Sequence, residues 1–168
     1  LSLTKVDGDP MVDSEIIYMS PTIQRVVRRL SAIADQAFIT IDLQLDQDVP
    51  ILILEDDLYQ IVYNLIENGI KYNVPGGKLS ISLHQQEDNA ILRVSDTGMG
   101  IPADAVDHIF ERFYRVDKAR SRQTGGSGLG LSIVKTLVER NKGEIYAENP
   151  YVFGKVLRQT YGAVSIEF

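Results

Sequence analysis

The stretch GGSGLGLSIVKTLVERN, residues 125–141, places four glycines directly before a segment with apolar residues at helical spacing. The apolar positions predict one buried helix face, formed by Leu129, Ile133, Val134, Leu137 and Val138. Each ordered glycine costs about 0.5–1 kcal/mol relative to alanine, and a simple turn needs only one. No Gly-Lys-Ser/Thr follows, so the stretch is not a P-loop. Two interpretations stay open: a mobile linker, or a backbone that approaches a ligand such as a phosphate chain.

The composition is that of a globular domain, and it excludes several classes of protein. The 168 residues are 44% hydrophobic and 24% charged, with a formal net charge of −6. There is no cysteine, so disulfides and cysteine-ligated metals are excluded. No apolar run reaches the ~18 residues of a membrane-spanning helix, and the first residues do not resemble a signal peptide. An acidic domain is a poor candidate for nucleic-acid binding through its overall charge, although a basic cluster lies at residues 112–122.

The pattern of apolar residues predicts one α/β domain. Ser20 followed by Pro21 is typical of a helix start, with Ser20 as the N-cap. Helical periodicity predicts helices over residues 20–37, 55–72, 102–110 and 128–141. Alternation predicts strands over residues 38–45, 78–85, 90–96, 144–148 and 163–168, while residues 149–162 give no prediction. We therefore expect a two-layer sandwich in which a mixed, mostly antiparallel sheet of about five strands packs against three helices, with a long loop over residues 114–127.

The first residue, Leu1, is not methionine, so we expect the chain to be part of a longer protein. Residues 1–12 are interpreted as the end of an upstream helix and a linker, and residues 13–168 as the domain itself.

The second predicted helix carries a polar stripe within NLIENGIKYN, residues 64–73. Asn64, Asn68 and Lys71 lie at i, i+4 and i+7, on one side of a helix with ~100° per residue, and Glu67 lies beside them. The stripe is either the solvated face of an amphipathic helix or a ligand site. Asparagine is a poor helix former, and its amide oxygen is a ligand that Mg²⁺ accepts, so both details favour the ligand site.

A second candidate site lies in VSDTGMGIP, where the predicted strand alternation stops at Asp96. A capped turn is one interpretation of an Asp-x-Gly-x-Gly sequence. The other is that the carboxylate accepts a hydrogen bond from an exocyclic amine, while Gly98 and Gly100 let a flat ring lie against the backbone. Because a carboxylate accepts and does not donate, this interpretation favours adenine over guanine.

Four motifs occur in a fixed order: NLIENGIKYN, DTGMGIP, IFERFYRVD and GGSGLGLSIVK. Together they resemble the N, G1, F and G2 boxes of the catalytic ATP-binding domain of sensor histidine kinases, within the ATPase superfamily that includes gyrase and the mismatch-repair ATPases. The resemblance covers residues 20–148. It implies Mg²⁺ and ATP as cofactors and a mobile lid over the nucleotide.

The resemblance also implies roles for residues of the first two motifs. Asn68 matches the asparagine that ligates Mg²⁺, with Asn64 near the phosphates. Lys71 and Tyr72 match the pair that lines the nucleotide site. Asp96 matches the aspartate that reads the adenine amine, beside Gly98, Gly100 and Ile101.

In the last two motifs, the resemblance implies a lid and its hinge. Phe110 and Phe113 match the aromatics that anchor the base of the lid, and Tyr114 and Arg115 fall where the family contacts the nucleotide. The glycine-rich hinge would let the lid close over the phosphates through Gly126, Ser127, Gly128, Leu129 and Gly130. The lid residues Lys118, Arg120 and Arg122 either add countercharge or form a solvated basic loop.

The sequence departs from the family pattern at several positions. Gly69 stands where the family more often has alanine, and Ser127 replaces the commoner threonine. NKGE, residues 141–144, replaces the usual His-Gly-Gly. The segment before the last strand is longer than in the family, which leaves the pairing of that strand open.

The resemblance implies phosphoryl transfer to a histidine rather than hydrolysis. The gyrase-like branch uses a glutamate as general base, and the matching position here is Asn64, which cannot take a proton. The catalytic group implied is Asn68, Lys71, Glu67 and Arg115, with Glu67 orienting or deprotonating the acceptor imidazole. His84 and His108 are both expected to be structural, so the phosphorylated histidine is expected upstream of Leu1 on a helical dimerisation domain.

The implied partners are that dimerisation domain and, indirectly, a response-regulator receiver domain, with no nucleic acid and no membrane contact by this domain. The implied location is the cytoplasm, in a parent protein that is a membrane-anchored sensor. Two alternatives stay open: a nucleotide-sensing regulatory module without catalysis, and a serine or threonine kinase of the anti-sigma or mitochondrial dehydrogenase-kinase type.

Overall fold

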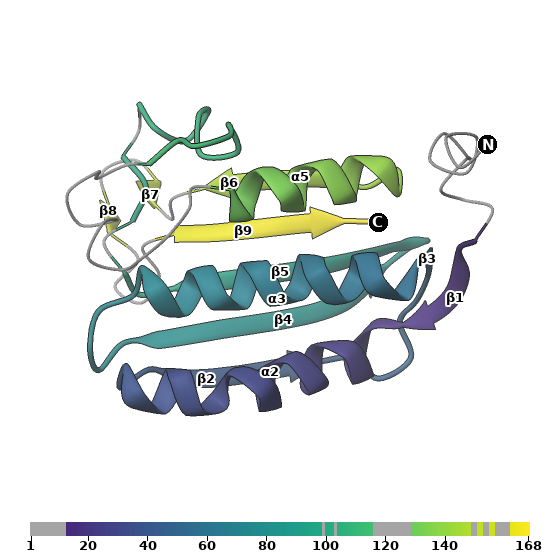
Figure 1. Ribbon diagram of the computed structural model, residues 1–168, viewed down its shortest axis with the longest axis horizontal. Coiled ribbons are helices and arrows are strands. Elements are labelled where there is room, and N and C mark those ends of the chain that lie inside the picture. The colour runs from purple at the N-terminus through teal and green to yellow at the C-terminus, as the bar shows by residue number, and fades with distance from the viewer. Residues whose placement is uncertain are drawn as a thin grey trace, which may run out of the picture.

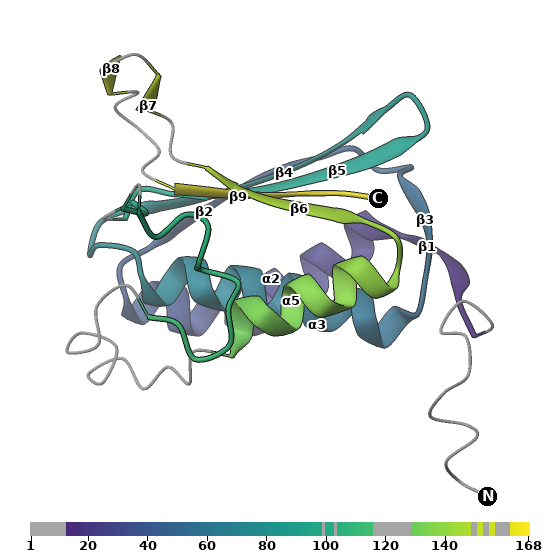
Figure 2. The same cartoon turned by 90° about the horizontal axis from the view of Figure 1, so that it is seen from above.

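A five-stranded sheet carries the fold, and helices cover one of its faces (Figures 1 and 2). The structure is a computed structural model that describes residues 13–98, 100–102, 104–115, 129–148, 151–152, 155–156 and 162–168. The strand order across the sheet is β2 (Thr40–Leu45), β4 (Lys78–Gln86), β5 (Asn89–Asp96), β9 (Gly162–Glu167) and β6 (Glu144–Glu148). Only the β2–β4 pair is parallel, and the other pairs are antiparallel. The predicted mixed, mostly antiparallel sheet is therefore confirmed.

The helical layer within the described residues consists of α2 (Met19–Gln36), α3 (Glu55–Lys71) and α5 (Gly130–Arg140). All three lie on the same side of the sheet (Figure 2). None of the helices in this described part is long and apolar enough to cross a membrane. The predicted two-layer α/β sandwich with three main helices is confirmed.

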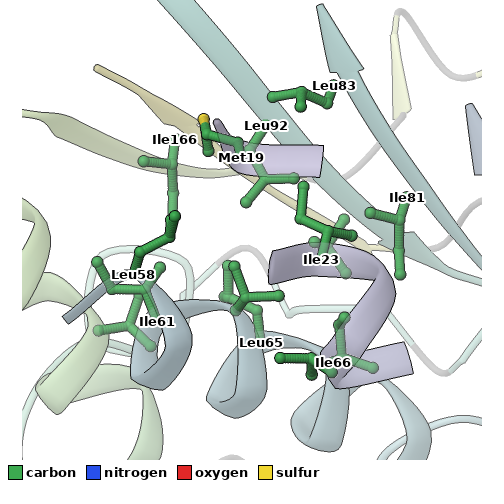
Figure 3. Close-up of a cluster of buried hydrophobic side chains, with 14 of the residues drawn as sticks. Met19, Ile23, Leu58, Ile61, Leu65, Ile66, Ile81, Leu83, Leu92 and Ile166 are labelled. Atoms are coloured by element: carbon green, nitrogen blue, oxygen red, sulfur yellow. The ribbon is translucent and has the colours of Figure 1, made fainter. Parts of the chain in front are cut away.

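The core lies between these two layers and follows from the sequence periodicities. In β4, the alternate residues Leu79, Ile81 and Leu83 are at most 1% exposed, so one face of the strand is buried. Helix α3 contributes a matching apolar face through Leu58, Ile61, Leu65 and Ile66, which meets Met19 and Ile23 of α2 together with residues from the sheet (Figure 3). Burying side chains of this size stabilises the fold by about 1.5–3 kcal/mol each.

A small two-stranded ribbon at one edge was not predicted. It pairs β1 (Glu15–Tyr18) with β3 (Pro50–Ile53) in antiparallel register. Ile51 and Ile53 face the core, whereas Ile16 and its cross-strand partner Leu52 are 70% and 49% exposed. Both strands are only four residues long and lack polar alternation, so the sequence carries no period-2 signal for them.

The predicted N-cap of the first helix is wrong. Helix α2 begins at Met19, and Tyr18 occupies the N-cap position without a side-chain cap. The Met19 amide donates to the carbonyl of Val49, and its side chain is fully buried, so tertiary contacts fix the start of the helix. Ser20 is therefore buried in the first turn, where Pro21 is tolerated because the amide it lacks would have no helical partner.

The other boundaries differ from prediction in smaller ways. Phe38 has φ 58°, which ends α2 and delays the next strand to Thr40. Helix α3 ends at Lys71, and α5 is described from Gly130. The predicted helix over residues 102–110 is wrong: its described residues form consecutive turns, with amides of Val106 and Ile109 donating four residues back.

The C-terminal part closes the sheet. The unassigned stretch contains a short hairpin of β7 (Tyr151–Val152) and β8 (Lys155–Val156). Strand β9 then inserts between β5 and β6, which answers the open question of its pairing. The interpretation of residues 1–12 as an upstream helix end and linker lies outside the described residues.

Candidate functional site

Three chain segments that carry the predicted site residues meet toward one end of the molecule. They are the C-terminal half of α3, the end of β5 and the start of α5, at the left in Figure 1. This arrangement follows from the topology, because α3 and β5 both run toward that end while α5 starts there.

The polar stripe of α3 is half-buried rather than fully solvated. Asn64, Glu67, Asn68 and Lys71 all have intermediate exposure, while the opposite side of the helix is buried. Lys71 Nζ lies 2.5 Å from Glu67 Oε1, one turn earlier on the helix. In the protein without ligand, Lys71 is therefore held along the stripe by Glu67.

Asp96 lies at the last residue of β5 and has a perturbed acidity. One carboxylate oxygen accepts a hydrogen bond from the amide of Gly98 at 2.7 Å. Burial raises the pKa of Asp96 to about 6, and the Gly98 hydrogen bond lowers the pKa in partial compensation. Among the described residues only this oxygen of the half-buried carboxylate accepts a hydrogen bond, so the other oxygen can accept one from a ligand donor.

Gly98 brings the strand end against the end of α3. A Cβ at position 98 would lie 2.5 Å from the carbonyl oxygen of Tyr72 and 3.3 Å from the Cα of Asn73. Because a Cβ cannot lie 2.5 Å from a backbone oxygen, only glycine permits this approach. The carbonyl of Tyr72 and the carboxylate of Asp96 both lie close to Gly98. The next predicted glycine, Gly100, has φ 75°, a left-handed conformation that favours glycine.

The start of α5 lies beside the stripe of α3. A Cβ at Gly130 would lie 3.9 Å from Asn64 Oδ1, which is an ordinary van der Waals distance. The first turn of a helix carries amides without helical partners and the positive end of the dipole. This turn therefore presents anion-binding groups beside Asn64, next to Leu129 at the N-cap position.

The segment after the strand end packs partly on α5. Lys135 of α5 lies over the ring of Phe110, 5.9 Å from its centroid. Phe113 has φ 64° and is 65% exposed. Tyr114 packs against His108, with ring centroids 5.7 Å apart, and Arg115 has intermediate exposure.

Residues 53–163 match the family model described as the histidine kinase-, DNA gyrase B-, and HSP90-like ATPase. The chain belongs to this ATPase family. The matched region contains the stripe of α3, Asp96 and the start of α5, so the expected family resemblance is confirmed.

Relatives of this ATPase domain include named sensor kinases. The sensor histidine kinase RppB of Synechocystis is 48% identical over 95 residues, which cover 56% of this chain and 21% of that protein. The sensor histidine kinase WalK of Bacillus subtilis is 36% identical over 152 residues, covering 89% of this chain and 25% of that protein. The chain thus spans only about a fifth to a quarter of these relatives.

Solved structures give the same fold. The mycobacterial sensor histidine kinase MprB superposes with a TM-score of 0.77 at 26% identity, covering 92% of this chain and 96% of that chain. The catalytic domain of histidine kinase ThkA also gives a TM-score of 0.77, at 22% identity and with coverage of 92% and 94%. The second likeness concerns the fold alone.

The structure accounts for one departure of this ATPase domain from the family pattern. A Cβ at Gly69 would lie 2.4 Å from Cδ1 of Leu79, a fully buried residue of β4. Leu79 therefore occupies the space that the methyl group of the commoner alanine would need.

Sequence reasoning located some site residues and not others. The structure brings Asn64, Asp96, Gly98 and Tyr72 into the contacts described above, while Tyr114 contacts His108 instead. His84 and His108 are exposed, and His108 pairs with Glu111 at 2.7 Å. The predicted positions outside the described residues are Lys118, Arg120, Arg122, Gly126, Ser127 and Gly128.

Two polar clusters were missed. Asn73 and Thr97 bond to each other and to Lys78 beside Asp96, although both residues stand at the borders of the motifs. Asp57, in the first turn of α3, is 4% exposed and accepts from Arg140 and Asn141 at the end of α5. No local sequence signal marks the second cluster, because its partners are more than eighty residues apart.

Proposed function

We propose that this chain is the ATP-binding catalytic domain of a two-component sensor histidine kinase. In this proposal it binds Mg-ATP and transfers the γ-phosphoryl group to a histidine on a separate helical dimerisation domain. The single observation that carries the proposal is the convergence of the α3 stripe, Asp96 and the α5 start at one end of the sandwich. The relatives named as sensor kinases support it.

The adenine end of the site is proposed at Asp96. Its free carboxylate oxygen would accept the exocyclic amine of adenine, and the ring would lie against Gly98 and Gly100 near Ile101. The close approach of Gly98 to Tyr72 supports this assignment, because no side chain intrudes there.

The phosphate end is proposed between α3 and α5. The amides of the first turn of α5 would bind phosphate oxygens. Lys71 would exchange its Glu67 partner for phosphate, since both groups are acidic and the pair is half-exposed. We place Gly126, Ser127, Gly128 and Arg115 at the same phosphates on the family resemblance.

A magnesium ion is proposed at Asn68. The residues fit this ion, because the amide oxygen of the half-buried Asn68 is a neutral hard ligand of the kind that Mg²⁺ accepts beside phosphate oxygens. When bound, the ion supplies charge neutralisation for the triphosphate. Asn68 would orient it without contributing charge.

The transfer itself requires little covalent chemistry from this domain. A bond would form between the acceptor imidazole nitrogen and the γ-phosphorus, and the bond to the bridging oxygen would break and release ADP. Asn64 cannot act as a general base, which favours transfer over hydrolysis. Once Lys71 moves to the phosphates, the Glu67 carboxylate would be available to orient or deprotonate the acceptor histidine.

The acceptor and the partners are proposed to lie outside this chain. His84 on the exposed face of β4 and His108 beside Glu111 are unsuited to the role, since neither lies on an acceptor helix. A solved complex of histidine kinase ThkA with the response regulator TrrA supports a receiver domain as the downstream partner. We propose a cytoplasmic location within a membrane-anchored sensor.

Calorimetry with ATP and magnesium tests the binding part of this proposal. We expect wild-type protein to bind Mg-ATP, and Asn68→Ala to lose at least ten-fold in affinity because the metal loses its protein ligand. Gln60→Ala is a matched control, since it removes an exposed amide from the same helix. The absence of any heat with the folded wild-type protein would refute the proposal.

A transfer assay tests the catalytic part. Labelled γ-phosphate should move from ATP to an added helical phosphoacceptor domain, and Asn68→Ala should slow the transfer. Binding without transfer would instead favour a nucleotide-sensing module. Label appearing on serine or threonine would favour the other alternative.

A further inference from the structure

The β4–β5 ladder ends at the proposed adenine site with a hydrogen bond to a side chain. Its last regular pair is Leu79 with Asp96. Beyond this pair, the amide of Thr97 donates to the carbonyl of Lys78 at 3.1 Å, and the amide of Lys78 donates to Thr97 Oγ1 at 2.8 Å. The threonine hydroxyl thus takes the place of a backbone carbonyl. The chain can therefore turn away from the sheet immediately after Asp96.

Asn73, the residue after the C-cap of α3, completes this arrangement. It is 6% exposed, and its Nδ2 donates to the carbonyl of Lys78 at 3.0 Å. Its Oδ1 accepts from the amide of Val74 at 2.9 Å and from the Thr97 hydroxyl at 3.1 Å. The end of α3 and the end of β5 are therefore joined by side chains whose hydrogen bonds are mutually consistent.

Gly77 closes the space around these side chains. A Cβ at this position would lie 2.3 Å from Asn73 Oδ1, 2.6 Å from Thr97 Oγ1 and 2.8 Å from the carbonyl of Val74. The Gly77 carbonyl also accepts from the amide of Thr40 at the start of β2. The cluster is packed tightly and anchored to the neighbouring strand, so it has little freedom to rearrange.

Thr97 and Asn73 are next in sequence to Asp96 and Tyr72, the two residues beside the proposed adenine position. Thr97 lies between Asp96 and Gly98, and Asn73 follows Tyr72. The same segment contains the 2.7 Å hydrogen bond from the Gly98 amide to Asp96 and the approach of Gly98 to the Tyr72 carbonyl. Any rotation of the Thr97 backbone would therefore turn the Asp96 carboxylate as well.

We propose that Thr97 and Asn73 are positioning residues that hold the Asp96 carboxylate in the orientation that accepts the adenine amine, and that they thereby set the preference for adenine over guanine. The inference rests on the proposed function of the site. Guanine presents a carbonyl where adenine presents its amine, so a fixed carboxylate rejects it. A carboxylate that can turn away loses both the attraction to adenine and the repulsion of guanine.

The affinities of wild-type protein and three variants for ATP and GTP, measured by calorimetry with magnesium, test this role. Thr97→Val keeps the shape but removes the hydroxyl, and we expect about ten-fold weaker ATP binding and a similar fall in the ATP-to-GTP affinity ratio. Thr97→Ser restores the hydroxyl and should recover both values to within about three-fold. Thr136→Val is the matched control, since it removes a hydroxyl that donates to the carbonyl of Ser132 on α5.

The outcomes separate this inference from the proposed function. Wild-type protein that binds no ATP refutes the proposed function. Wild-type protein that prefers ATP, together with a Thr97→Val variant that keeps the same affinity and ratio, overturns the positioning role alone. A loss of affinity in Thr97→Val that Thr97→Ser does not recover also overturns it.

If Thr97→Val does not fold, amide hydrogen exchange of the wild-type protein tests the positioning role instead. The Lys78 amide should be protected before any nucleotide is added, because the Thr97 hydroxyl already accepts from it. Exchange of this amide at the rate of an open loop, with protection appearing only after ATP is added, would overturn the positioning role.

Discussion

Lys142 adopts a left-handed backbone conformation, with φ 61°, directly after α5. The amides of Lys142 and Gly143 donate to the carbonyls of Glu139 and Val138, which is the Schellman arrangement of a helix end. A backbone with this φ favours glycine. The lysine therefore carries a conformational cost that no side-chain contact within the described residues offsets.

We expect Lys142→Gly to raise the free energy of unfolding by about 0.5–1 kcal/mol, because glycine adopts φ near 60° without strain. Urea unfolding measures the change. Lys142→Ala keeps the Cβ and should leave stability within about 0.5 kcal/mol of wild type. An equal gain in Lys142→Ala would assign the effect to the lysine side chain instead of the backbone.

Burial of the Asp96 carboxylate lowers the stability of the folded protein at neutral pH. Its pKa rises from 3.8 to about 6 on folding, because burial disfavours the charged form. Between these values the native state binds a proton that the unfolded state does not, so the contribution of this group to stability falls as pH rises through this window. Above pH 6, the folded protein carries a half-buried carboxylate whose charged form is destabilising.

We therefore expect Asp96→Asn to be more stable than wild type at pH 7.5 by roughly 1–2 kcal/mol, after allowing for partial solvent screening. The advantage should shrink as pH falls from about 6 toward 4. Urea unfolding at several pH values measures it. A stability difference that stays constant across this range would contradict the assignment. The same variant should lose ATP binding, since an amide can present a donor to the adenine amine.

At the scale of the elements, a polar cluster joins α3 to α5, the two helices that carry the proposed phosphate end of the site. Arg140 Nη2 and Nε lie 2.5 Å and 3.2 Å from the two carboxylate oxygens of Asp57, and Asn141 Nδ2 lies 2.9 Å from Oδ2. The Asp57 side chain is 6% exposed and the Arg140 side chain 42%. These bonds join the start of α3 to the end of α5, and the proposed site lies at the opposite ends of the two helices.

We expect Arg140→Met to lower the free energy of unfolding by about 1–3 kcal/mol, because Asp57 would keep only the Asn141 amide as a partner. Denaturant unfolding measures the loss. The double variant with Asp57→Asn should recover part of it, since no buried charge remains. A loss below about 0.5 kcal/mol would mean that solvent compensates the carboxylate.

At the scale of the whole molecule, ligand binding should be visible as stability. A ligand that binds only the folded state at 100 times its dissociation constant adds about 2.7 kcal/mol. For a chain of this size we expect Mg-ATP to raise Tm by about 5–11 °C. Differential scanning calorimetry measures the shift, and Asp96→Asn should abolish it. An equal shift in Asp96→Asn would place the nucleotide elsewhere.

The spacing of apolar residues within single helices and strands was sufficient to predict much of the fold. The alternation of Leu79, Ile81 and Leu83 predicted a half-buried strand, and the α3 stripe with Asn64 and Asn68 was predicted from helical spacing alone. Such patterns are local, because burial on one face repeats with the period of the element itself. The β1–β3 ribbon escaped prediction, since its two four-residue strands show no alternation of polar and apolar residues.

What the sequence by itself determined was the identity of the three main helices and of the five strands of the main sheet, together with the chemistry of the candidate site, namely amides, a lysine and a carboxylate at fixed spacings. Only the tertiary structure decided the start of α2 at Met19, the bonds of Asn73 to Thr97, and the pairing of Asp57 with Arg140. The raised pKa of Asp96 belongs to this second group. The physical reason is that these properties depend on burial and on contacts between residues distant in the chain, which no local period encodes.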